Sequence, residues 1–138
     1  MVAATQNRNT PTRADRRRSH PVAASALCYA GAIAVMNASG YAAPATTATG
    51  LTALGVFHAQ VDNTNGADGD EIVEIERGCF RFANDGGDPI DRTLIGTTCY
   101  LVDDQTVAAT DGTGTRSAAG TVDDIDDAGV WVRIDPTA

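Results

Sequence analysis

From Val22 to the C-terminus, apolar residues alternate with polar ones or form short β-branched runs that end at Gly, Asn or Asp. Such runs are typical of short strands separated by turns. No stretch repeats its apolar residues with the spacing of an amphipathic helix. Many short strands in succession favour a small closed or layered sheet. The sequence therefore predicts an all-β fold, a small β-barrel or sandwich of short antiparallel strands.

The turn residues place the individual strands. We expect strands over 32–36 and 41–43, with Pro44 ending the pairing, and a hairpin of 54–61 with 71–82. Gly78 stands within the second strand of this hairpin, where a β-bulge would bend it. The remaining predicted elements are one helical turn over 92–95, a strand over 99–102, a short exposed strand over 107–109, and a final hairpin of 119–122 with 130–134.

Charge divides the chain into two unequal parts. Residues 1–20 hold five arginines and one acid, a net +4, whereas residues 21–138 hold five arginines and seventeen acids, a net −12. Large apolar side chains are almost absent before Val22, so the basic part has little to bury in a core. The length leaves room for one domain of common size. We therefore predict an extended basic N-terminal arm over 1–21, which orders on a partner, and a single β domain over 22–138.

The N-terminus also imitates a signal peptide, with a basic cluster, an apolar run over 22–36 and small residues over 42–45. Against this reading, Ser25 and Gly31 interrupt the run, and the basic cluster begins unusually far from Met1. An exported surface β-domain with a cleaved N-terminal signal stays as an alternative. No stretch is long and apolar enough to span a bilayer, so we expect no membrane partner.

The residues that usually perform catalysis are few. His20 lies in the arm, and His58 is the one histidine of the body, where a lone strand histidine is usually structural. Cys28, Cys79 and Cys99 are odd in number and lack CxxC spacing, which favours reduced, buried thiols, although a bridge between Cys79 and Cys99 stays open. We predict that the protein is not an enzyme and needs no cofactor.

Two acidic segments, 62–70 and 123–127, are rich in the oxygen ligands that calcium prefers. Neither has the ligand spacing of a calcium-binding loop, and both are typical of solvated turns. A calcium-stabilised binding module is the second alternative. The arm's arginines would neutralise phosphates, but the acidic body would be repelled by a duplex, and no strand has the aromatic spacing of a stacking platform. We expect no specific nucleic-acid partner.

Protein assembly is the remaining role for the arm. Twenty extended residues span about 65 Å, enough to lie along a neighbouring subunit or to add a strand to its sheet. Arginine side chains would pair with carboxylates there, and apolar side chains beneath them would be buried. The predicted partner-binding residues are Arg8, Arg13, Arg16, Arg17, Arg18, Val22 and Leu27.

Several short motifs follow one another between residues 28 and 134. They are Ala30-Gly31-Ala32, Gly40-Tyr41-Ala42-Ala43-Pro44-Ala45, Val61-Asp62-Asn63 before Gly66-Ala67-Asp68-Gly69, Arg77-Gly78 before Phe80-Arg81-Phe82-Ala83-Asn84, and Gly129-Val130-Trp131-Val132. Through their order and spacing, the chain resembles the tailed-phage capsid cement, or head-decoration, proteins. The arm departs from this likeness, because such proteins often begin much closer to the first strand.

The resemblance implies a non-enzymatic β-barrel protein that binds the outside of an expanded icosahedral shell and resists the pressure of packaged DNA. Its partners would be the major capsid protein and other copies of itself, commonly as trimers at threefold positions. It would be made in the host cytoplasm and reside on the exterior of the virion. Together with the arm, it suggests a clamp in which the body covers a junction of capsid subunits and the arm staples neighbours together.

Overall fold

The computed structural model describes residues 2–10, 13 and 15–138, and it confirms the all-β prediction. Helical structure in these residues is confined to one 3-10 turn, η1 (Arg92–Leu94). The strands are β1 (Arg17–Pro21), β2 (Leu27–Cys28), β3 (Ile33–Met36), β4 (Ala42–Pro44), β5 (Thr52–Phe57), β6 (Val61–Asp62), β7 (Ile72–Glu76), β8 (Gly78–Asn84), β9 (Thr98–Leu101), β10 (Thr106–Ala108), β11 (Ala118–Asp126) and β12 (Gly129–Ile134).

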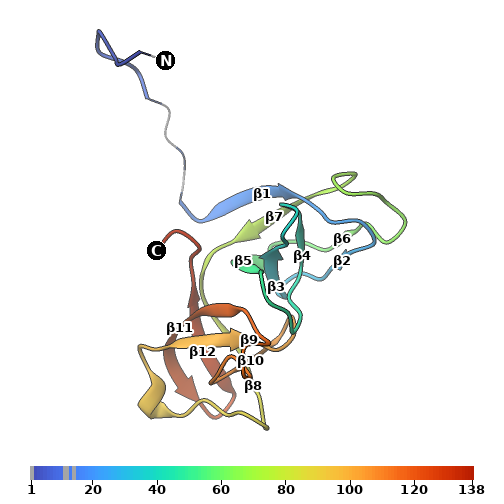
Figure 1. Cartoon of the computed structure of the whole chain (residues 1–138), viewed down its shortest axis with the longest axis vertical. Coiled ribbons are helices and arrows are strands. Elements are labelled where there is room, and N and C mark those ends of the chain that lie inside the picture. Colours follow the sequence, from blue (N-terminus) through green and yellow to red (C-terminus); the bar gives the residue numbers. More distant parts are fainter. Residues whose placement is uncertain (1, 11–12, 14) are drawn as a thin grey trace.

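The strands form a sheet, a small barrel and a separate pair. The sheet has the order β1-β7-β5-β3-β4, the closed barrel has the order β10-β8-β12-β11-β9, and β2 pairs with β6. Figure 1 shows the barrel below the sheet, with β2 and β6 at the far end of the sheet from the start of β1. Neighbouring named strands are antiparallel except for β8 and β10, which are parallel. The sequence-based choice between barrel and sandwich is thus resolved as a barrel joined to an open sheet.

The chain passes from the sheet to the barrel at Arg77 and Gly78. A single bent strand was predicted over 71–82, and the structure divides it into β7, which pairs with β1 and β5, and β8, which pairs with β10 and β12. Gly78 has a φ of +153°, which residues other than glycine rarely adopt. In place of the predicted β-bulge within one strand, the structure has a break between two strands, and the chain changes sheets at this point.

Two apolar cores lie on opposite faces of the sheet. Successive strand residues point to opposite faces, so Ile33 and Val35 pack with barrel residues such as Leu101, whereas Ala34 packs with Phe57 beneath β2 and β6. All five of these residues are buried. The sheet is consequently covered by the barrel on one side and by the β2–β6 pair on the other.

Part of the predicted arm belongs to this folded body. Residues 17–21 form β1, which pairs along its whole length with β7. Val22 follows with 0% of its surface exposed, inside the core beneath β2 and β6, and its N–H donates to the Glu71 carbonyl at 2.9 Å. The prediction that Val22 binds a partner is therefore wrong, because its side chain is needed to fill the protein's own core.

Two local predictions also differ from the structure. The strand predicted over 54–61 ends at Phe57, and His58, expected in mid-strand, is an exposed bend residue whose N–H donates to the Glu74 carbonyl at 2.8 Å. The short strand near 107 was expected to be exposed, yet Val107 and Ala108 are fully buried. Their burial follows from the place of β10 between β8 and β9, where it closes the barrel.

Candidate partner interface

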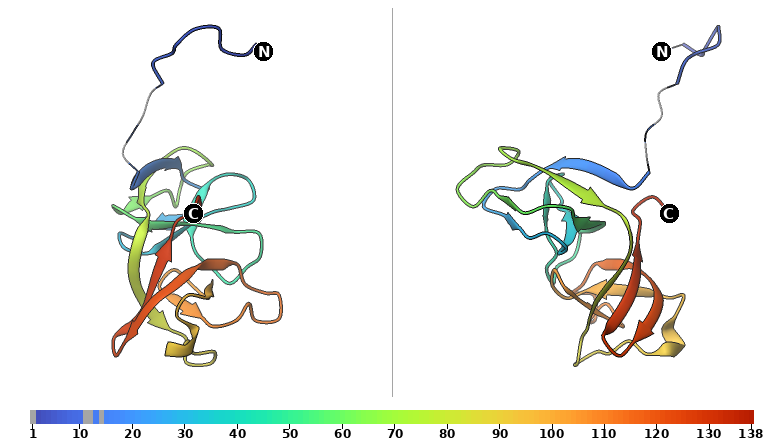
Figure 2. Two further views of the ribbon diagram at one scale, coloured as in Figure 1. Left: turned by 90° about the vertical axis from the view of Figure 1, so that its left-hand side faces the viewer. Right: turned by 180° about the vertical axis from the view of Figure 1, so that it is seen from behind.

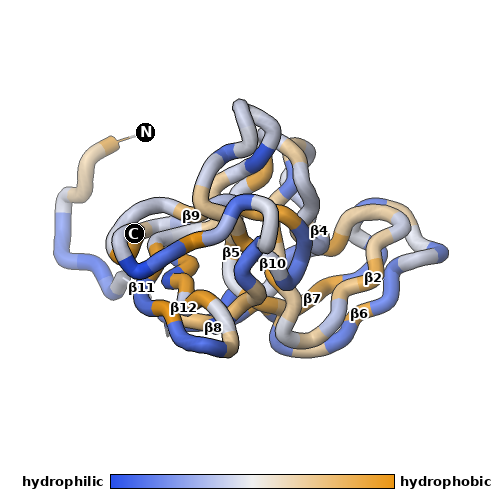
Figure 3. Tube along the Cα trace, turned by 90° about the horizontal axis from the view of Figure 1, so that it is seen from below, coloured by the Kyte–Doolittle hydropathy of each residue, from blue (hydrophilic) through white to orange (hydrophobic). Residues whose placement is uncertain are grey.

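The arm before β1 leaves the body and carries two of the predicted arginines. The described residues 2–10 and 13 belong to no strand and are exposed. Figures 1 and 2 show the N-terminal segment leading away from the sheet in every view, and Figure 3 shows it standing clear of the body from below. Within the described part of the chain, neither Arg8 nor Arg13 forms a salt bridge. These two guanidinium groups are thus presented to solvent.

Arg16 and Arg17 have partners within the chain instead. Arg16 Nη2 lies 2.7 Å from Glu76 Oε1, and Arg17 Nη1 lies 3.3 Å from Glu74 Oε1. No residue of β1 is fully buried, so the strand is held by main-chain hydrogen bonds and by charge rather than by apolar burial. A signal for this pairing exists in the sequence, because the Arg-rich segment has a charge complement in Glu74 and Glu76, which lie two residues apart.

Arg77 connects the root of the arm, residues 15–18, to the C-terminal segment, residues 135–138. Its Nε donates to the Asp15 carbonyl at 2.7 Å, and its own backbone N–H donates to the Arg16 carbonyl at 2.9 Å. Its Nη1 donates to Asp135 Oδ1 at 3.2 Å and to Thr137 Oγ1 at 3.0 Å. Its side chain is only 11% exposed. Sequence reasoning did not find this role, because only the tertiary fold brings the two ends of the chain to Arg77.

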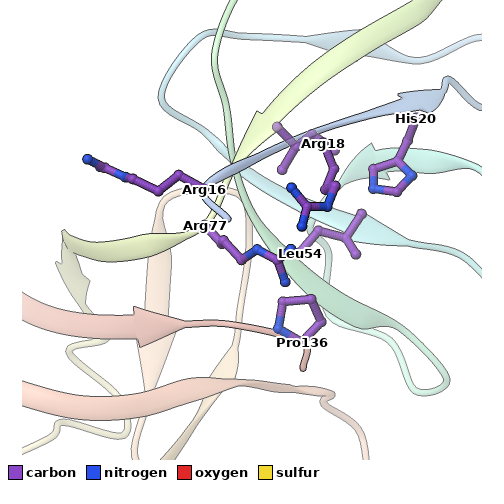
Figure 4. Close-up of a pocket in the computed structure, with 7 residues that line it drawn as sticks. Arg16, Arg18, His20, Leu54, Arg77 and Pro136 are labelled. Atoms are coloured by element: carbon purple, nitrogen blue, oxygen red, sulfur yellow. The ribbon is translucent and has the colours of Figure 1, made fainter. Parts of the chain in front are cut away.

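A small cleft lies beside β1, between this strand and the C-terminal segment. Arg18, His20 and Arg77 line it, and its apolar lining consists of Leu54, Ile75 and Pro136. Arg16 lies at its edge, with its guanidinium group directed away from it toward solvent (Figure 4). Figure 4 shows the Arg18 and Arg77 side chains directed into the same space above Leu54 and Pro136. The volume is about 30 Å³. The cleft thus combines two guanidinium groups with an apolar floor.

The electrostatics of this cleft follow from burial and from the clustered guanidinium groups. Desolvation, followed by the charges of Arg13 and Arg77, lowers the pKa of Arg18. The same causes, burial first and then Arg13, Arg18 and Arg77, lower the pKa of His20. His20 is therefore neutral at neutral pH, and the arginines supply the positive charge.

The structure does not gather all the predicted partner-binding residues into one surface. Leu27 lies half-buried on β2, where it pairs with Asp62 of β6. In Figure 1, β2 and β6 lie near one end of β1, and the arm leaves from the other end. Arg16, Arg17 and Arg18 lie at the root of the arm, and Arg8 and Arg13 lie further out. The arm and its root are consequently the candidate interface. Val22 is excluded from it because it is buried, and Leu27 because it lies elsewhere on the body.

The carboxylates of the loop from Asp62 to Asp70 accept hydrogen bonds from the chain itself. Asp62 Oδ1 accepts from the Thr64 N–H and hydroxyl, at 2.9 and 2.7 Å. Asp68 Oδ1 accepts from the Ala24 N–H at 2.8 Å. These bonds agree with the turn role predicted for the segment. In the described residues, no three His, Cys, Asp or Glu side chains are grouped closely enough to hold a metal ion.

The three cysteines carry free thiols. Cys28 and Cys99 are buried as predicted, whereas Cys79 is exposed, so the prediction of a buried thiol there is wrong. Apart from the short turn η1, the described chain has no helix, and therefore none of a length that could cross a membrane. The chain matches no protein-family model, no curated protein and no solved structure.

Proposed function

We propose that this protein is a structural component of a virion, a capsid cement or head-decoration protein that binds the outer surface of an icosahedral head. The observation that carries the proposal is the exposed basic arm, with Arg8 and Arg13 directed to solvent, attached to an acidic body. Such an arm suits a partner that presents carboxylates beyond the reach of the body. The motifs that resemble the cement proteins lie in the body and support the same class of protein.

The root of the arm supports a role in bearing load. β1 pairs with β7 at every residue from Arg17 to Pro21, and Arg77 ties the main chain at Asp15 and Arg16 to the same place. A pull directed along the axis of β1 would be shared by all the bonds of the strand pair. We infer that β1, held by its pairing with β7, transmits force from a capsid-bound arm to the two cores of the body.

The energetics require many weak contacts. An exposed ion pair contributes about 0–1 kcal/mol, and ordering the arm costs about 1–2 kcal/mol for each residue. Arg8 and Arg13 alone do not offset that cost, so the arm must also pair its backbone with a capsid strand. Repetition of the contact over a shell then supplies avidity. In this proposal, the major capsid protein is the partner, further copies of the chain assemble beside it as trimers, and the protein is made in the host cytoplasm.

The test separates the arm from the folded body. Deleting residues 2–13 removes Arg8 and Arg13 and leaves β1, Asp15 and Arg16 in place, whereas a longer deletion would remove a strand of the sheet. We expect the shortened protein to melt as the full chain does and to lose binding to shells assembled from the major capsid protein, measured by co-sedimentation and electron microscopy. Equal shell occupancy by both proteins would contradict the proposal.

Two further variants separate charge from chain length. The double change Arg8→Gln and Arg13→Gln keeps the length of the arm and removes its solvent-directed charges, so we expect weaker and less salt-dependent decoration. Arg133→Gln is the matched control, because it removes one exposed arginine from the barrel. It should decorate shells as the unchanged protein does.

A further inference from the structure

We propose that the cleft at the root of the arm, between β1 and the C-terminal segment, binds a carboxylate side chain of a partner protein. This inference deepens the proposed function, on which it rests for the identity of the partner. The cleft would then be a specific docking point next to the arm, and an acidic residue of the capsid surface would be its ligand.

The arrangement of donors carries this inference. Arg18 reaches the cleft from β1, and Arg77 reaches it from the connection between β7 and β8. Figure 4 shows the Arg18 and Arg77 guanidinium groups on either side of one space. Their side chains are 22% and 11% exposed, so both are ordered by the surrounding protein. Two guanidinium groups held in this way are pre-arranged donors for a planar oxyanion.

Three carboxylates lie close to the arginines beside the cleft but do not line it. Glu76 pairs with Arg16 at 2.7 Å, and Asp135 pairs with Arg77 Nη1 at 3.2 Å. The third, Asp15, lies with Oδ1 4.0 Å from Arg18 Nη2 and 3.9 Å from Arg77 Nη2, and its side chain is 93% exposed. Asp15 is thus a weak, solvent-exposed partner that the two arginines share. A partner carboxylate that forms shorter bonds would displace it.

The size and the lining of the cleft favour a carboxylate over a phosphate. A volume of about 30 Å³ admits a group no larger than a few water-sized atoms. Leu54, Ile75 and Pro136 form apolar walls that suit the methylene groups of Glu or Asp. A phosphate has oxygens on all sides and would leave some of them facing these walls without donors. His20 is neutral at neutral pH and adds no charge to attract a more highly charged anion.

The experiment uses the full chain in low salt and follows the arginine Nε–Hε signals by NMR. The probe is the capped peptide acetyl-Gly-Glu-Gly-amide, compared with acetyl-Gly-Gln-Gly-amide and with inorganic phosphate. We expect the glutamate peptide to shift the Arg18 and Arg77 signals in a saturable way, and the glutamine peptide to leave them unchanged. Phosphate should bind more weakly than the glutamate peptide.

Three variants complete the test. Arg18→Gln should abolish the saturable shift of Arg77, whereas Arg92→Gln, which removes an arginine of η1 that is 75% exposed, should leave it intact. Asp15→Asn removes the internal competitor at a fully solvated position and should tighten peptide binding about threefold, the effect of one exposed ion pair. This variant keeps the inference testable even where Arg18→Gln perturbs β1.

The inference is overturned if the glutamate peptide gives no saturable shift, if the glutamine peptide or phosphate binds at least as tightly, or if Asp15→Asn leaves the affinity unchanged or weaker. Capsid shells take no part in this experiment, so its failure leaves the decoration test standing. Conversely, the protein that lacks residues 2–13 retains Arg16, Arg18 and Arg77 and should still bind the peptide even though it no longer decorates shells.

Discussion

Arg77, at the turn between sheet and barrel, holds the Asp135 carboxylate near the C-terminus, with 3.2 Å between Nη1 and Oδ1. The two side chains are only 11% and 18% exposed. Because Nε of the same guanidinium donates to the Asp15 carbonyl, one side chain connects the beginning of the folded body to its end. The arm and the C-terminus are therefore anchored at a common point.

We expect Arg77→Gln to lower the free energy of unfolding by about 1–3 kcal/mol, since it removes charge-assisted hydrogen bonds and leaves Asp135 without its partner. Urea unfolding followed by Trp131 fluorescence measures the change. The matched control is Arg92→Gln, whose arginine is 75% exposed and 4.0 Å from Asp124, and it should change stability by less than about 0.5 kcal/mol. Equal effects of the two variants would show that Arg77 does not anchor the fold.

A second prediction concerns Gly55, where β5 approaches β7. Its φ is +145°, and a Cβ built there would lie 2.1 Å from the Glu76 carbonyl oxygen. Gly55→Ala therefore combines a steric clash with a strained backbone, and we expect a loss of about 2 kcal/mol or more in thermal or chemical unfolding. Gly86→Ala is the control, because no atom lies within 4 Å of its added Cβ. If both variants melt together, the close approach of β5 and β7 is wrong.

The third prediction is a pH dependence that involves Asp88. Its Oδ2 accepts from the Thr110 hydroxyl at 2.6 Å and from Arg116 Nη1 at 2.9 Å, and the bond from Thr110, followed by weaker contributions that include Arg116, lowers the pKa of Asp88. Because the pKa is lower in the folded state, the stabilisation is complete above the ordinary aspartate pKa of about 3.9. It is lost as the pH falls through the folded-state value.

Asp88→Asn should therefore melt below the unchanged protein at neutral pH, and the difference should shrink as the pH falls below about 4. Differential scanning calorimetry over a pH series measures this difference. A gap in melting temperature that stays constant down to strongly acidic pH would contradict the assignment.

The fourth prediction distinguishes the three thiols. Burial raises the pKa of Cys28 to about 11 and that of Cys99 to about 12, so both are protonated and shielded in the folded protein. Cys79 is exposed. We expect a thiol reagent at mildly alkaline pH to modify Cys79 alone in the native state and all three after unfolding, with Cys79→Ser as the control that abolishes the native reaction. Rapid native modification of Cys28 or Cys99 would contradict their burial.

Much of the fold was predictable because its signals are local. The final hairpin was expected to turn near Asp126 and Gly129, and β11 and β12 do so, since turn residues and alternating apolar residues act over a few positions. Gly78 was a local signal too, although it lies where two strands separate and not at a bulge within one strand. In contrast, the burial of Val107 depends on barrel closure between β8 and β9, which no local pattern specifies.

The candidate interface divides in the same way. The sequence by itself determined that the N-terminal segment is basic and poor in apolar residues, and hence that Arg8 and Arg13 are exposed. Only the tertiary structure decided that Arg17–Pro21 completes a sheet, that Val22 belongs to a core and that Arg77 anchors both ends of the chain. The physical reason is that a polar strand gains its stability from a free strand edge and from opposite charges far away in sequence. Those groups become neighbours only when the whole chain has folded.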